Sequence, residues 1–223
     1  MTELDLVSQQ RRARGILLLI AGIPAAIMLA ATVLWWLVEA GHVDLRSQFG
    51  TANHGDLLNP PRSVSGIAFR HDGVAELLWK DLPVKWRLLV VQRGATCDTI
   101  CEAQLYQTRQ IHLALGKDFN RVGRVLLSDT SPADTLFAGD GMAEPSTARS
   151  NLFPEWLARE HQSLTPLTLP TSRLDELVPE ASALPSQWYV VDPAGWIMMS
   201  VSDDLHYKDV ISDLRFLLKH SGA

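Results

Sequence analysis

An apolar stretch near the start of the chain is the longest hydrophobic feature of its pattern. Residues 15–38 are 24 positions without a charged side chain, and about 20 are enough for a helix to cross a bilayer. Trp35 and Trp36 lie near its end, where interfacial aromatic residues are expected. The pattern therefore predicts a transmembrane anchor. A cleaved signal peptide is the alternative, because small residues such as Ala30 and Ala31 lie inside the stretch.

Beyond this stretch, shorter hydrophobic runs alternate with helical patterns. Strands are predicted over Trp86–Val91, Val122–Leu127, Gln187–Val191 and Trp196–Val201. Helices are predicted over Cys101–Leu115, Phe153–His161, Thr171–Val178 and His206–His220, and a β-hairpin around Asp72 and Gly73. Residues 44–62 are expected to be irregular, because they contain glycine and Pro60–Pro61.

The order of these elements predicts an α/β fold with a thioredoxin-like domain. Two parallel strands joined by a helix are followed by an antiparallel hairpin and a final helix, which is the thioredoxin arrangement. We expect four segments along the chain: a cytoplasmic N-terminus (1–14), a transmembrane anchor (15–38), a juxtamembrane linker (39–62) and the thioredoxin-like domain (63–223).

Charges that flank the apolar stretch predict its orientation. Three arginines among residues 11–14 precede it, whereas Glu39 and Asp44 follow it. Positive residues stay on the cytoplasmic side, so we expect the bulk of the chain outside the cytoplasm. In a bacterium, this is a single pass through the inner (plasma) membrane with the C-terminal domain in the periplasm, where a disulfide can persist.

The charge balance and the cysteine count narrow the function. The chain has 20 Lys and Arg against 25 Asp and Glu, a formal net charge of −5. This balance gives no support to a nucleic-acid partner. The chain contains 2 cysteines, which cannot form a framework of several disulfides. They form either one site or one structural crosslink.

Cys97 and Cys101 carry the candidate chemistry. They follow the buried run Leu88–Val91 and stand at the start of a predicted helix, whose N-terminus favours a thiolate. The pair fits disulfide exchange or the binding of a soft metal such as Cu(I), and a structural disulfide is the third interpretation. Asp98 opposes thiolate formation. We expect Cys97 to be the nucleophile and the more exposed thiol.

The stretch from Leu88 to Thr135 resembles the Sco/SenC family of membrane-anchored, thioredoxin-fold proteins. The likeness rests on the Cys-x3-Cys pair, on residues 125–135 as a strand with an aspartate- and proline-containing turn, and on Tyr189–Gly195 as a late strand and turn. The resemblance implies assistance in the copper loading of cytochrome c oxidase. It also implies cytochrome c oxidase subunits or other assembly factors as partners.

Two positions depart from the family pattern. The family's copper-binding histidine is missing from residues 181–188, and His206 is the best replacement, so the candidate Cu(I) ligands are Cys97, Cys101 and His206. Leu184–Pro185 stands in the place of the missing histidine. Thioredoxin-like oxidoreductases carry a cis-proline there, facing the thiols. We therefore hypothesise that this bond is cis and that Pro185 shields or orients the thiols, against the alternative of an ordinary trans proline.

Three functions agree with these residues. The first is a membrane-anchored Sco-like factor that assists cytochrome c oxidase assembly, through thiol–disulfide exchange or Cu(I) handling. The second is a general periplasmic thiol–disulfide oxidoreductase, which is the enzyme activity that the chain could have. The third is a non-catalytic, membrane-anchored assembly scaffold. The third predicts that replacing both cysteines leaves function intact.

Overall fold

The computed structural model describes residues 3–39, 53–71, 75–137 and 152–220. The chain divides into two units, Met1–Ala52 and Asn53–Ala223. In the first unit, α1 (Glu3–Glu39) contains the segment Leu18–Leu37, whose 20 residues are long and apolar enough to cross a membrane. Large apolar side chains of this segment are exposed, which fits the lipid-facing surface of a single-pass membrane protein.

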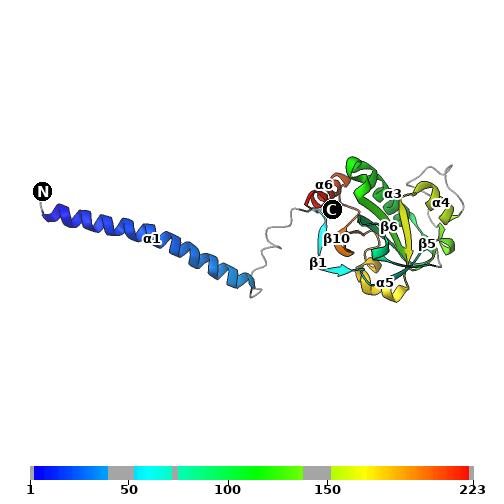
Figure 1. The fold of residues 1–223 in the computed structure, drawn as a ribbon, viewed down its shortest axis with the longest axis horizontal. Helices are drawn as coiled ribbons and strands as arrows, with labels where there is room; N and C mark the ends of the chain where they lie inside the picture. Colours follow the sequence, from blue (N-terminus) through cyan, green and yellow to red (C-terminus); the bar gives the residue numbers. More distant parts are fainter. Residues whose placement is uncertain (1–2, 40–52, 72–74, 138–151, 221–223) are drawn as a thin grey trace. The chain divides into compact units, whose positions relative to one another are not determined.

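The second unit is built on a mixed eight-stranded sheet with the order β1-β10-β9-β4-β6-β8-β2-β3 (Figure 1). Its strands are β1 (Asp56–Ser63), β2 (Ala68–His71), β3 (Ala75–Leu78), β4 (Trp86–Gln92), β6 (Val122–Ser128), β8 (Leu164–Thr168), β9 (Trp188–Val191) and β10 (Trp196–Val201). A small second sheet pairs β5 (Thr96–Cys97) with β7 (Leu136–Phe137).

The central strands have the predicted thioredoxin connectivity. β4 runs parallel to β6, and the helix α3 (Thr99–Ala114) connects the two strands. β9 lies antiparallel to β4, and β10 lies antiparallel to β9. β2 and β3 pair antiparallel, as the predicted hairpin requires. The thioredoxin-like α/β fold is therefore confirmed.

Helices cover both faces of the sheet, as Figure 1 shows. The remaining α-helices are α4 (Phe153–Glu160), α5 (Thr171–Leu177) and α6 (Tyr207–His220), and the 3-10 helices are η1 (Trp79–Asp81), η2 (Gly116–Arg121), η3 (Pro132–Asp134) and η5 (Pro179–Ser182). Leu88 and Val90 of β4 pack in one core with residues of α3, α4 and α6, whereas Leu89 and Val91 pack in a second core with α5. Burial on both faces explains why β4 reads as a continuous apolar run.

Two strands contain prolines and were not predicted. β1 contains Pro60 and Pro61 and pairs with β10 at the edge of the sheet, with its register broken between Leu57 and Arg62. The expectation of irregular structure over residues 44–62 is therefore wrong for residues 56–62, while residues 44–52 lie outside the described residues. β8 contains Pro166 and pairs in parallel with β6. Proline lacks the N–H that a strand donates, so a sequence with prolines argues against a strand.

Candidate functional site

Cys97 and Cys101 form a disulfide at the corner between β4 and α3, with their Cα atoms 5.2 Å apart. Cys97 lies in β5, and Cys101 lies in the first turn of α3. The connection between β4 and β5 includes Gly94, whose φ of 74° favours glycine. The sequence therefore places the sulfur pair at the carboxyl edge of a central parallel strand, where ligands commonly bind in α/β sheets.

Asp129 ties this corner to the neighbouring strand. It directly follows β6, and its Oδ1 accepts a hydrogen bond of 2.7 Å from the backbone N–H of Gly94. The hydroxyl of Thr171 donates to its other carboxylate oxygen at 3.3 Å. The side-chain amide of Gln92 donates to the carbonyl of Gly94 at 2.8 Å. The aspartate after the second parallel strand thus supports the loop that leads to the cysteines.

Asp98 caps the helix that carries Cys101. Its Oδ1 accepts from the backbone N–H groups of Ile100 (3.1 Å) and Cys101 (3.0 Å). A cap satisfies donors that have no partner within the helix. The same carboxylate places a negative charge at the end of the helix where a thiolate would form, so the cap stabilises the helix and opposes thiolate formation.

We expect Asp98→Ala to lower the free energy of unfolding by about 1 kcal/mol, because the cap is lost. Asp98→Asn should preserve most of the stability, because asparagine also caps helices. It should also speed alkylation of the reduced cysteines, because the opposing charge is removed. Urea unfolding and iodoacetamide kinetics of the two variants test this; equal alkylation rates in Asp98→Asn and the unchanged chain would refute the charge effect.

A hollow of about 180 Å³ lies beside the disulfide, lined by residues from the end of β4, the start of α3 and the segment 181–185. Cys101 lines this hollow. Cys97 is fully buried (0% exposed), whereas Cys101 is 6% exposed. The expectation that Cys97 is the more exposed sulfur is therefore wrong, because β5 pairs with β7 and the Cys97 side chain packs into the core.

Pro185 lines the same hollow as Cys101, as the sequence suggested. The cis peptide bond that the described residues contain is Asn59–Pro60, so Leu184–Pro185 is trans and the cis hypothesis is wrong. Gln104 of α3 holds the segment in place: its Nε2 donates to the carbonyls of Pro185 (3.1 Å) and Gln187 (3.0 Å). Side-chain hydrogen bonds thus bring the proline segment to the cysteine helix without a cis bond.

His206 lies in a different hollow, next to Tyr106 and Ile111 farther along α3, and its ring contacts Tyr207 at 4.6 Å between centroids. Within the residues that the structure describes, no three His, Cys, Asp or Glu side chains form a group that could hold a metal ion. The structure therefore does not assemble Cys97, Cys101 and His206 into one site. The position of His206 beyond the late hairpin brings it to α3, but not to its cysteine end.

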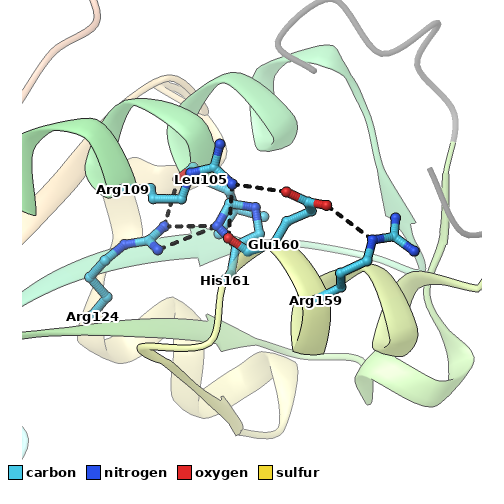
Figure 2. Close-up of polar contacts among 6 residues, drawn as sticks. All are labelled: Leu105, Arg109, Arg124, Arg159, Glu160 and His161. Atoms are coloured by element: carbon cyan, nitrogen blue, oxygen red, sulfur yellow. Dashed lines mark hydrogen bonds and ion pairs between the residues drawn. The ribbon is translucent and has the colours of Figure 1, made fainter. Parts of the chain in front are cut away.

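A buried network connects α3, α4 and β6 (Figure 2), and the sequence did not reveal it. Arg124 of β6 is 1% exposed and donates to the carbonyl of Leu105 and to the Nδ1 of His161, with its two terminal nitrogens 3.3 and 3.4 Å from that Nδ1. Arg109 donates to the backbone carbonyl of Glu160 at 2.8 Å. The sequence signal that points to this network is the charged Arg124 inside the apolar run Val122–Leu127.

The network has a defined charge state. Burial and, to a smaller extent, the positive charge of Arg109 lower the pKa of Arg124 to about 9, so Arg124 stays protonated at neutral pH. Burial lowers the pKa of His161 to about 3, together with the positive charges of Arg124 and Arg109. A neutral imidazole can accept from Arg124, as this geometry requires. The network thus fixes the helix that carries Cys101 to α4 and to the sheet.

Comparisons with known proteins identify the fold. A family model described as "Transmembrane-like, thioredoxin-like, C-terminal domain" matches residues 86–221. Copper-bound yeast Sco1 covers 77% of this chain and 96% of its own, at 15% identity and a TM-score of 0.50. A second yeast Sco1 structure covers 73% of this chain and 95% of its own, also at 15% identity and a TM-score of 0.50. A Bacillus anthracis Sco1/SenC family lipoprotein covers 72% of this chain and 99% of its own, at 16% identity and a TM-score of 0.49.

At these identities, the likeness to Sco proteins concerns the fold, and the Sco/SenC resemblance of the sequence is confirmed at that level. No curated protein matches the chain.

Proposed function

This chain belongs to the family of transmembrane-like, thioredoxin-like C-terminal domains, and from that membership we propose that Cys97 and Cys101 exchange thiols and disulfides with a client protein. The observation that carries the proposal is a closed disulfide at the strand-to-helix corner, with Cys101 in the wall of a solvent-connected hollow. A purely structural crosslink needs no such access.

The exchange begins with the reduced pair. One thiolate attacks a sulfur of the client's disulfide, a mixed disulfide forms, and the client's other sulfur leaves as a thiolate that takes a proton from water. The second cysteine of the pair then attacks the mixed disulfide. This step restores the Cys97–Cys101 bond and releases the reduced client, so two electrons pass to the client. An external dithiol reductant regenerates the pair.

We propose that this chemistry takes place on the outer side of a membrane. The arginines among residues 11–14 favour a cytoplasmic N-terminus, which directs the thioredoxin-like unit to the periplasm of a bacterium. Oxidising conditions there permit a disulfide to be exchanged rather than held reduced. The sequence resemblance to Sco/SenC proteins favours a cytochrome c oxidase subunit or another assembly factor as the client.

A test uses the full chain in detergent micelles, reduced and then freed of reductant. It should reduce a disulfide-bonded peptide and recover its own disulfide, while a variant carrying both Cys97→Ser and Cys101→Ser does neither. In cells that make the chain, the double variant should fail to restore oxidase activity after deletion. Restoration by the double variant would instead favour the scaffold, and reduction of unrelated proteins without an oxidase defect would favour a general oxidoreductase.

Copper handling is the alternative use of the same sulfurs. After reduction, two thiolates suit Cu(I), which prefers soft ligands. The described residues bring no third donor to them, so the donor set does not fit a three-ligand site with histidine. The Cu(I) affinity of the reduced chain, measured against a chromophoric chelator, separates the two uses. A tightly held ion that is lost in Cys101→Ser and kept in His206→Ala would favour copper handling through the cysteines alone.

A further inference from the structure

We infer that Cys101, and not Cys97, is the sulfur that bonds to the client, and that an extended segment of the client enters the hollow beside it. The inference rests on the proposed thiol–disulfide exchange and names the reacting atom and the class of ligand. It reverses the expectation from the sequence, in which the first cysteine attacks.

The environment of Cys97 blocks approach. Its side chain is completely buried, and its strand β5 pairs with β7 so that Cys97 is the register partner of Phe137. The ring of Phe137 packs edge-on against Phe153 and Trp156, with centroids 5.3 and 5.2 Å away. Cys97 belongs to the same core as these aromatic side chains. A client sulfur would have to displace this core to reach Cys97.

The environment of Cys101 permits approach. Cys101 lines the hollow of about 180 Å³, which also has Ile100, Gln104 and Pro185 in its wall, and Cys101 is the more exposed of the two cysteines (6% against 0%). Pockets for cofactors and drug-sized ligands usually hold about 300–1,000 Å³. The smaller hollow suits one residue of an extended polypeptide, such as a cysteine with its flanking backbone.

Two polar groups in the wall are suited to a polypeptide backbone. The Oε1 of Gln92 and the Nε of Arg93 are buried and have no hydrogen-bond partner among the described residues, although both residues line the hollow. An unpaired polar group is costly to bury, so a ligand that pairs with it gains affinity. Gln92 Oε1 can accept from a client N–H, and Arg93 Nε can donate to a client carbonyl. Both atoms are covered in the oxidised form, so these side chains must turn toward the client as it docks.

The two cysteines react in a fixed order, and two electrons pass to the client. The Cys101 thiolate attacks the client's disulfide, and the Cys101–client disulfide forms as the client's other sulfur leaves and is protonated. Cys97, four residues before Cys101 in the sequence and shielded from solvent, then attacks the sulfur of Cys101. The Cys97–Cys101 bond re-forms and the client leaves reduced. A shielded second thiol reacts with Cys101 rather than with a second client.

The test compares Cys97→Ser and Cys101→Ser in the full chain in detergent micelles. The probe is a short peptide whose cysteine is disulfide-bonded to thionitrobenzoate, and the release of the coloured thiolate gives the rate. Cys97→Ser, which keeps Cys101, should react at least about tenfold faster than Cys101→Ser, because access limits exchange. Equal rates, or a faster reaction of Cys101→Ser, would overturn this inference but not the proposed function. Failure of both variants would overturn the proposed function as well. Cys97→Ala and Cys101→Ala repeat the comparison without burying the hydroxyl that serine introduces.

A second measurement tests the role of Gln92. Gln92→Leu should slow the reaction of the chain with the peptide probe roughly fivefold, the effect of about one lost hydrogen bond. The variant also removes the Gln92–Gly94 hydrogen bond, which affects both probes alike. The reaction with the small disulfide of thionitrobenzoate should therefore be slowed less than the reaction with the peptide probe, because the small probe has no peptide backbone. Gln162→Leu, at an exposed position of another hollow, is the matched control and should change neither rate. Equal slowing with both probes, or none, would refute recognition of the client by Gln92.

Discussion

The substitution Trp188→Ala should lower the free energy of unfolding of the thioredoxin-like unit by about 3–5 kcal/mol, the usual cost of removing a buried aromatic side chain from a core. Trp188 of β9 is completely buried and stands opposite Val90 of β4 and Val201 of β10. It belongs to the core that also contains both cysteines. The cavity would therefore weaken the central sheet next to the disulfide.

Two further tryptophan variants give this prediction its controls. Trp196→Ala removes a side chain that is 43% exposed, and should cost less than about 1 kcal/mol. Trp188→Phe should cost less than Trp188→Ala, because it retains an aromatic ring and removes an indole N–H that lacks a partner among the described residues. Urea unfolding of the full chain in mild detergent, followed by circular dichroism, measures all three. Similar losses for Trp188→Ala and Trp196→Ala would contradict the placement of the core.

The second large effect is a loss of stability in acid that depends on His161. Burial, with Arg124 and Arg109, lowers the pKa of His161 from its usual 6.5 to about 3 in the folded chain. Below pH 6.5, the unfolded chain binds a proton at this residue and the folded chain does not, so protonation favours unfolding. The stability from this group is present above pH 6.5 and is lost as the pH falls toward 3. The full loss is on the order of 3–5 kcal/mol.

His161→Phe should flatten the decline of stability between pH 6.5 and 4. His206→Ala is the matched control, since it removes an exposed histidine outside the network. His112 does not confuse the comparison: burial lowers its pKa too, but it is present in all three chains. Urea unfolding at several pH values gives the slopes, and NMR titration of the His161 ring reports its protonation directly. The same slope in His161→Phe and in the unchanged chain would show that His161 does not drive the acid effect.

The sequence predicts the centre of this fold well and its edges less well. β4, α3, β6, β9 and β10 were predictable because their apolar residues are buried on one or both faces, and burial leaves a periodic pattern. β1 and β8 were not, because Pro60 and Pro166 contradict strand propensity and only pairing within the sheet stabilises these segments. The antiparallel pair of β2 and β3 was predictable from the turn signal of Asp72 and Gly73 between them.

At the site, the sequence reveals the residues but not their relative exposure. The spacing of Cys97 and Cys101 identifies the candidate chemistry, and Pro185 does lie in the same hollow as Cys101. Which sulfur is accessible depends on the pairing of β5 with β7, and two-residue strands leave no pattern in a sequence. Gln92 and Gln104 were missed for a related reason: a buried polar side chain looks like an exposed one until its tertiary neighbours are known.

The most direct test of the account is the reduction potential of the Cys97–Cys101 pair, measured by equilibrating the full chain in detergent micelles with defined ratios of reduced and oxidised dithiothreitol or glutathione. A disulfide that exchanges with clients should have a potential between about −120 and −270 mV, the range of thiol–disulfide oxidoreductases. A potential below about −300 mV would mark a structural crosslink and would contradict the exchange function.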